Sequence, residues 1–165
     1  MLEIALHGPA RAHPVGRQVP VTVTVRNTSR DVVWAAGVLD GSEDGVRYPR
    51  YLPSVLRDGR PVAGPPAPED PLVGPLRPGD FRRLAPGESF DPTGHGFLPL
   101  TTFTTYAPDL PGRYLYGLSL STESDTPEDW LGRFGQGEER AAVLELVKRV
   151  PRLTVTSVPL EVVVE

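Results

Sequence analysis

Hydrophobic and polar residues alternate along several short stretches of the chain. Residues 2–7 read LEIALH, and residues 19–26 read VPVTVTVR with a valine at every second position. Because successive side chains of a strand point to opposite faces of a sheet, both stretches predict half-buried β-strands. Residues 109–123 repeat the pattern and place four large side chains on one face: Tyr114, Tyr116, Leu118 and Leu120.

Glycine-, proline- and asparagine-rich turns separate further segments of extended character. The sequon Asn27-Thr28-Ser29 is interpreted as one such turn, and DGSEDG at residues 40–45 as another. We expect strands or extended chain at residues 31–39 with Trp34 near the middle, at 46–56, 80–84, 89–92 and 94–108, and at 152–165 with a bend at Pro159.

Proline is unusually frequent, with 20 prolines and 17 glycines in 165 residues. Residues 57–79 (RDGRPVAGPPAPEDPLVGPLRPG) are the densest part. A central strand does not tolerate that density, because proline cannot donate to the ladder. The sequence therefore predicts a long, partly polyproline loop over residues 57–79.

Residues 126–150 (TPEDWLGRFGQGEERAAVLELVKRV) predict a helical insert before the last strand. Thr126 with Asp129 resembles a capping box, and Pro127 suits the first helical position. After a GQG break, a second helix is expected to begin near Glu138 and to end before Pro151. Its apolar residues recur at helical spacing, at Val143, Leu146, Val147 and Val150.

The apolar stripe of this insert must face something, and three interpretations stay open. It can cover an open edge or end of the sheets. It can form a surface for a partner, with Trp130, Arg133 and Phe134 as anchors of the types common at interfaces. It can also enclose a ligand cavity between helix and sheet.

About seven short strands with few helices predict an antiparallel β-sandwich, a single domain over residues 1–165. The motifs VTVTVRNTS, LAPGES and LPGRYLYGLSL resemble bacterial immunoglobulin-like families, among them the intracellular proteinase inhibitor family. The resemblance implies a tyrosine corner at Tyr114. It also implies that Tyr116 takes the place of a disulfide cysteine and packs with Trp34. These motifs mark turns and core positions, so they imply a fold more than an activity.

Charge and composition exclude several kinds of chemistry. A net charge of -4 gives no basic footprint for nucleic acid, and the absence of cysteine excludes disulfides, thiolate catalysis and cysteine-based metal sites. No apolar run is long enough for a signal peptide or a membrane span. If Met1 is the natural start, we expect a cytoplasmic protein. No cofactor is expected.

Two short motifs are candidates for catalysis or metal binding. His95 lies between glycines and is interpreted as a loop histidine, with a small hydrolase as the alternative. Asp40, Ser42 and Asp44 sit at calcium-loop spacing, but the twelfth position is Tyr51, which cannot supply a bidentate carboxylate. We interpret that segment as an acidic turn, with weak calcium binding as the alternative.

The sequence therefore predicts a non-catalytic domain that binds another protein or a second copy of itself. The expected binding residues are Trp130, Arg133, Phe134, Tyr48 and Tyr51. Tyr48 and Tyr51 belong to the RYPRY segment, where aromatic and basic side chains interleave. Such rings can stack on bases or sugars, but the acidic net charge favours one ring packed inward and the other exposed. A cytoplasmic proteinase inhibitor is the alternative that the resemblance implies.

Overall fold

The computed structural model describes residues 1–68, 72–132 and 136–165, and most of its elements are short strands. The strands are β1 (Leu2–His7), β2 (Thr22–Asn27), β3 (Val33–Ala36), β4 (Arg50–Arg57), β5 (Arg60–Ala63), β6 (Phe81–Leu84), β7 (Ser89–Phe90), β8 (Gly112–Ser121), β9 (Thr154–Thr156) and β10 (Leu160–Val164). The helices are α1 (Thr101–Thr105) and α2 (Arg140–Arg149), with 3-10 turns η1 (Pro78–Asp80), η2 (Pro127–Trp130) and η3 (Gly137–Glu139).

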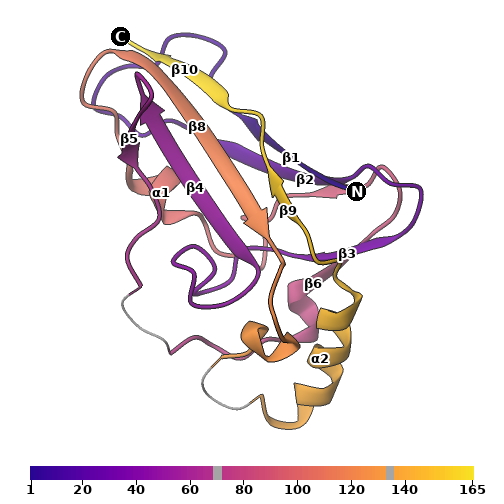
Figure 1. Cartoon of the computed structure of the whole chain (residues 1–165). Helices are drawn as coiled ribbons and strands as arrows, with labels where there is room; N and C mark the ends of the chain where they lie inside the picture. Colours follow the sequence, from indigo (N-terminus) through magenta and orange to yellow (C-terminus); the bar gives the residue numbers. More distant parts are fainter. Residues whose placement is uncertain (69–71, 133–135) are drawn as a thin grey trace.

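Two antiparallel sheets form the sandwich (Figure 1). One has the order β1-β2-β7, and the other has the order β10-β8-β4-β5, with β9 also paired to β8. These orders correspond to the A-B-E and G-F-C arrangement of immunoglobulin domains, with β5 as an added edge strand. The predicted immunoglobulin-like β-sandwich with a helical insert is thus confirmed.

Several strands are pieces of longer ladders, which is why the structure has more strands than the pattern suggested. β2 pairs with β7, and after a break in both chains β3 pairs with β6. The fully buried Asn27 fills this break: its amide donates to the carbonyl oxygens of Asp31 at 2.7 Å and Leu84 at 3.0 Å. The turn predicted at residues 27–29 is thus a bend over residues 29–31 that interrupts this ladder. The predicted bend at Pro159 separates β9 from β10 on the same partner strand.

The main core lies between the two sheets and is built from the inward faces that the alternation predicted. It includes Leu2, Ile4, Leu6, Val23, Val25, Tyr114, Tyr116, Leu118 and Leu120. Trp34 is a correction, because it is half-buried and packs on a second cluster instead. The ring that packs on Tyr116 is Phe103 of α1, with ring centroids 5.7 Å apart. Trp34 misses the main core because β3 continues β2, and the strand that crosses the core next is β4.

The tyrosine corner implied by the resemblance is present. The Tyr114 hydroxyl donates to the carbonyl oxygen of Leu110 at 2.7 Å, across the turn that leads into β8. Tyr116 follows on the same face of β8, yet its buried hydroxyl has no hydrogen-bond partner among the described residues. Burial raises the pKa of Tyr116, with the neighbouring Tyr106 and Tyr114 adding to the rise.

These two tyrosines provide a matched pair for a stability test. We expect Tyr114→Phe to lower the free energy of unfolding by about 1 kcal/mol, because a hydrogen bond is lost. Tyr116→Phe is expected to be neutral or stabilising by up to about 1 kcal/mol, because it removes an unsatisfied hydroxyl. Denaturant unfolding at neutral pH checks both variants, and equal losses would contradict the assignment.

Tyr116 also predicts how the stability of the protein depends on alkaline pH. Since the pKa of Tyr116 is raised on folding, its contribution to stability is present below the ordinary tyrosine pKa of about 10 and falls as pH rises above it. We expect Tyr116→Phe to flatten the alkaline loss of stability relative to the unchanged protein. Unfolding midpoints measured on both sides of the tyrosine pKa check this, and identical slopes would contradict it.

Part of the expected loop over residues 57–79 is a β-hairpin, which corrects the sequence prediction. β4 and β5 are joined by Asp58 and Gly59, both with positive φ (51° and 77°), as a two-residue type I′ turn requires. Pro61 lies in β5, which is the edge strand of its sheet, where a missing N–H is tolerated. Asp58-Gly59 is a usual hairpin-turn signal, and the sequence prediction missed it because it relied on the proline density of the segment.

The expected extended chain over residues 94–108 is also corrected, since Thr101–Thr105 form the short helix α1. The carboxylate of Glu43 accepts the backbone N–H groups of Thr101 at 2.7 Å and Thr102 at 2.8 Å, and the Thr102 hydroxyl at 2.7 Å. A carboxylate at a helix N-terminus satisfies donors that have no intrahelical partner. The cap comes from a distant part of the chain, so the local threonine-rich pattern did not reveal it.

The helical insert packs on its own chain, at the end of the sandwich where β3 pairs with β6 (Figure 1). Val143, Val147 and Val150 of the predicted stripe are buried, and Leu146 packs beside them at the margin of the second cluster. Ala36, Leu39, Leu76, Phe81 and Trp130 complete this cluster. Of the three interpretations, the structure supports the one in which the stripe covers an end of the sheets.

Candidate functional site

Trp130 lies at the junction between the insert and the sandwich. The backbone N–H of Thr126 donates to the Asp129 carboxylate at 3.2 Å, which holds η2 at the capping position that the sequence predicted. The indole that follows is fully buried, stacks on Phe81 with ring centroids 6.2 Å apart, and donates to the Ser124 hydroxyl at 3.0 Å. Its ring is therefore part of the interior and does not form a surface anchor in this structure.

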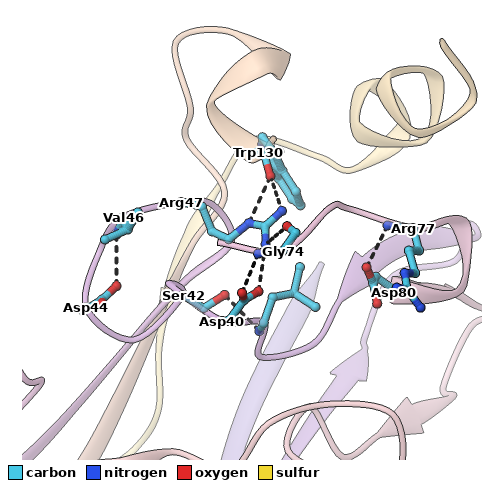
Figure 2. Close-up of polar contacts among 10 residues, drawn as sticks. Asp40, Ser42, Asp44, Val46, Arg47, Gly74, Arg77, Asp80 and Trp130 are labelled. Carbon is cyan, nitrogen blue, oxygen red and sulfur yellow. Dashed lines mark hydrogen bonds and ion pairs between the residues drawn. The ribbon is translucent and has the colours of Figure 1, made fainter. Parts of the chain in front are cut away.

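Arg47 binds backbone groups at this junction (Figure 2). Its guanidinium donates twice to the Trp130 carbonyl oxygen, at 3.1 and 2.8 Å, and once to the Gly74 carbonyl oxygen at 2.9 Å. It also pairs with Asp40 at 3.0 Å, and the second oxygen of that carboxylate accepts the Gly74 N–H at 2.6 Å. The side chain is 1% exposed. One arginine thus connects the turn after β3, the proline-rich segment and the insert.

Burying the charge of Arg47 costs free energy, and neighbouring carboxylates reduce that cost. Burial lowers the pKa of Arg47, while the negative charges of Asp40 and Asp80 oppose that shift. Asp80 belongs to η1, where its carboxylate accepts the Arg77 N–H at 2.8 Å (Figure 2). The arrangement is that of a structural cross-link, because every donor of the arginine that faces the interior meets a carbonyl or a carboxylate.

Side-chain oxygens of the DGSEDG turn accept hydrogen bonds from other groups of the protein. Asp40 holds Arg47 and Gly74, the Ser42 hydroxyl accepts the Leu39 N–H at 3.0 Å, and Asp44 accepts the Val46 N–H at 3.2 Å. No group of three or more metal-ligating side chains occurs in the part of the chain that the structure describes. The acidic-turn interpretation accounts for these contacts.

His95 is exposed, on a turn between β7 and α1. Within the described ranges, no hydrogen bond or ion pair involves its imidazole. In triad-type sites the histidine is oriented by a hydrogen bond to a neighbouring side chain. The arrangement fits the loop-histidine interpretation.

The predicted binding residues are therefore not gathered on one surface. Tyr51 is fully buried in β4, and its hydroxyl donates to the Ala36 carbonyl oxygen at 2.5 Å. Trp130 is buried as described, and Arg133 and Phe134 lie outside the described residues. Tyr48 alone, among the predicted residues that the structure describes, keeps a partly exposed side chain. The expectation that Tyr51 and Trp130 are surface anchors is corrected, since both rings fill the interior.

Tyr48 lies at a polar hollow of about 500 Å³ between the start of β4 and η2. Its backbone N–H donates to the Asp129 carbonyl oxygen at 3.3 Å, and the Arg50 guanidinium lies 4.3 Å from the centre of its ring. The remaining charged side chains that line the hollow are exposed carboxylates: Asp125, Glu128 and Asp129. The hollow is therefore acidic overall, and the insert supplies two of its three carboxylates, Glu128 and Asp129.

An apolar surface continues from this hollow along the outward face of the larger sheet. We call it the outer face; its central residues are Leu52, Ser54, Leu56, Leu115, Gly117 and Ser119, and the same hollowed surface extends to Thr156 and Pro159. Leu52 is 40% exposed and Leu115 is 37% exposed. Gly117 lies opposite Ser54 in the β4–β8 ladder, and a Cβ at Gly117 would lie 3.0 Å from the serine hydroxyl.

The absent side chain of Gly117 leaves a hollow of about 160 Å³ in the middle of the outer face. The residues that line the hollow carry no charge. Glu161 lies beside it, opposite Leu115 in the β8–β10 ladder, and pairs with Arg113 at 3.4 Å, and Arg50 begins β4 on the other side. Exposed leucines around a charge-free hollow are unusual on a sheet face that meets solvent. The outer face and the polar hollow together form the candidate site.

The sequence contained a signal for this face that the prediction did not use. β8 reads GRYLYGLSLS, so its outward positions hold Leu115 and Gly117 where a solvated strand usually carries charged residues. β4 likewise places Leu52 and Leu56 outward. The expectation concentrated on the insert, because long insertions are often functional.

Comparison with known proteins gives no family and one distant structural likeness. The sequence matches no family model and no curated protein. A CARDB domain from Pyrococcus furiosus, solved by NMR, aligns with 99% of this chain and 93% of its own at 13% identity, with a TM-score of 0.34. The strand order described above, rather than this likeness, supports the fold assignment. The proteinase-inhibitor resemblance stays a prediction.

The helices of the described chain are short. Among the described residues, no helix combines the length and the apolar character that a membrane crossing requires.

Proposed function

We propose that this protein is a non-catalytic interaction domain, and that it binds a partner protein through the outer face. The observation that carries the proposal is the combination of exposed Leu52 and Leu115 around a charge-free hollow with an adjoining polar hollow on the same side of β4. Stable protein interfaces have an apolar centre and a polar rim. The outer face has this composition, and the side chains that give it lie at the surface of the sheet, outside the hydrophobic core.

The chemistry of the rim indicates what the partner presents. Asp125, Glu128 and Asp129 outnumber Arg50 at the polar hollow. A complementary partner therefore carries an apolar side chain that fills the hollow beside Gly117. It also carries basic side chains that meet the carboxylates of the polar hollow. Rim charges of this kind mainly steer association and set specificity.

The experiment is capture of the partner from the source organism, followed by affinity measurement with the purified pair. Leu52→Glu is expected to weaken binding at least about tenfold, because it places a charge at the apolar centre. Glu128→Lys is expected to weaken binding by a smaller factor and to reduce its dependence on salt.

Val32→Glu is the matched control, since Val32 is 39% exposed, close to the value for Leu52, but lies in the loop before β3. Binding that survives Leu52→Glu and Leu115→Glu while Val32→Glu abolishes it would overturn the proposed site. Thermal unfolding of each variant shows whether a loss of binding reflects a loss of fold.

A further inference from the structure

β1 is an edge strand of the smaller sheet, and it is six residues long. β1 pairs with β2 along its whole length without a bulge, and its six residues include neither proline nor lysine. Exposed edges are normally shortened, charged, bent or covered, because their unpaired backbone groups template pairing with other chains. Of these devices β1 carries only one, the exposed charge of Glu3.

The other edges show what such protection looks like. β7 has two residues, and β5 contains Arg60 and Pro61. The edge of β10 is covered near its end, where the His13 N–H donates to the Val163 carbonyl oxygen at 2.8 Å and the His13 carbonyl oxygen accepts the Glu165 N–H at 3.0 Å. Compared with these three edges, the edge of β1 is longer and more open.

The direction of the free backbone groups follows from the β1–β2 register. The Thr28 N–H donates to the Met1 carbonyl oxygen at 2.9 Å, so the odd residues of β1 bond toward β2. The N–H and C=O groups of Leu2, Ile4 and Leu6 therefore point away from β2. Within the described ranges, no backbone partner meets them.

A groove of about 400 Å³ runs along this edge. Residues 2–6 line one side, and residues 155–161 of β9, the bend and β10 line the other. Val158, at the bend, is 82% exposed, the largest exposed fraction among the large hydrophobic residues of the described chain. The groove thus combines free backbone groups with an uncovered apolar wall.

We propose that β1 pairs with β1 of a second copy of this chain, antiparallel and about a twofold axis at Ala5. In this register Ile4 lies opposite Leu6 of the partner subunit, and the outward backbone groups form about four hydrogen bonds across the axis. Val158 and Pro159 flank the new ladder. The sheet β7-β2-β1 then continues into its symmetry mate, as a twofold interface requires.

Hydrogen-bonding complementarity between a carboxylate and an imidazole selects a second copy as the occupant. The outward face of β1 carries Glu3, Ala5 and His7. With Ala5 on the axis, Glu3 faces the partner's His7, and His7 faces the partner's Glu3. The small side chain of Ala5 lets the strands approach at the axis. The strand is complementary to itself, which an unrelated peptide would match only by chance.

The first experiment measures self-association of the full chain by sedimentation velocity, from low micromolar to millimolar protein. We expect a monomer–dimer equilibrium that Ala5→Lys weakens at least about tenfold, because two lysines meet at the axis. Thr24→Lys is the matched control: Thr24 is paired with Ala5 on the same face and is also half-buried, but it lies on β2, one strand away from the edge. It is expected to leave the dimer intact.

A charge-exchange experiment tests the register and does not depend on Ala5→Lys folding. Glu3→Lys and His7→Glu are each expected to remain monomeric at concentrations where the unchanged protein dimerises. Mixed together they should form a heterodimer, since the introduced lysine of one variant then faces the introduced glutamate of the other. The unchanged His7 and Glu3 face each other at the second contact. Hydrogen exchange at the Ile4 and Leu6 amides should slow as the unchanged protein associates.

A protein that stays monomeric throughout the concentration range overturns the proposal, as does a dimer insensitive to both Ala5→Lys and the charge exchanges. A dimer disrupted by Leu52→Glu would assign self-association to the outer face instead. The proposed β1 dimer does not depend on partner binding at the outer face. A negative result for either proposal therefore leaves the other unaffected.

Discussion

Replacing Trp130 with alanine is expected to lower the free energy of unfolding by about 3–5 kcal/mol, the cost typical of truncating a fully buried tryptophan. The indole is 0% exposed, stacks on Phe81 and connects α2 to the sandwich. Its loss leaves a cavity among side chains held by separate elements, so collapse of the site is limited. Denaturant unfolding followed by far-UV circular dichroism measures the loss without relying on indole fluorescence.

Trp34→Ala is the control, because the chain has two tryptophans and both contact the second cluster. Trp34 is half-buried at the rim, with the Arg149 guanidinium 5.8 Å from its ring. We expect this variant to lose about 1–2 kcal/mol, since less apolar surface returns to water. Equal losses for the two variants would contradict the central position assigned to Trp130.

The elements that the sequence predicted are those whose cause is local. Alternation in LEIALH and VPVTVTVR is enough to place β1 and β2, because one face of each strand is buried and the other is not. The valine spacing of α2 and the Thr126–Asp129 cap are likewise readable over a single turn. Tyr114 was placed through its turn, and its hydroxyl makes the expected bond.

The features that the sequence missed depend on contacts between distant residues. α1 forms because Glu43 caps it from another loop, against the strand preference of its threonines. The core position predicted for Trp34 failed because the alternation does not say whether a segment begins a new strand or continues the last one. An arginine at position 47 looks like a surface residue until the carbonyl groups of Gly74 and Trp130 are brought to it.

The candidate site was the least predictable part for the same reason. Whether an aromatic residue such as Tyr51 or Trp130 is an anchor or a core residue depends on what covers it, and local sequence does not contain that information. The outer face, in contrast, is encoded locally by leucines at the outward positions of β4 and β8.

Arg47→Met is expected to lower the free energy of unfolding by about 3 kcal/mol. Methionine fills a similar volume but donates no hydrogen bond, so the Trp130 and Gly74 carbonyl groups lose the guanidinium as partner. A buried carbonyl left without a partner costs about 1–3 kcal/mol, which applies in full to Trp130 and in part to the partly buried Gly74. Asp40, whose side chain is 49% exposed, can return to water and adds little. Arg47→Lys should recover part of the loss, because one ammonium cannot reach both carbonyl groups with the geometry of a guanidinium.

Arg57→Met is the matched control for Arg47→Met. Arg57 also donates twice to one carbonyl oxygen, that of Pro111, at 3.3 and 2.9 Å, but its side chain is 32% exposed. Water can replace the guanidinium there, so we expect a loss of no more than about 1 kcal/mol. Denaturant unfolding of the three variants at one pH and salt concentration makes the comparison. If Arg47→Met and Arg57→Met lose the same stability, burial does not set the strength of these bonds. In that case Arg47 is not the cross-link that holds the insert to the sandwich.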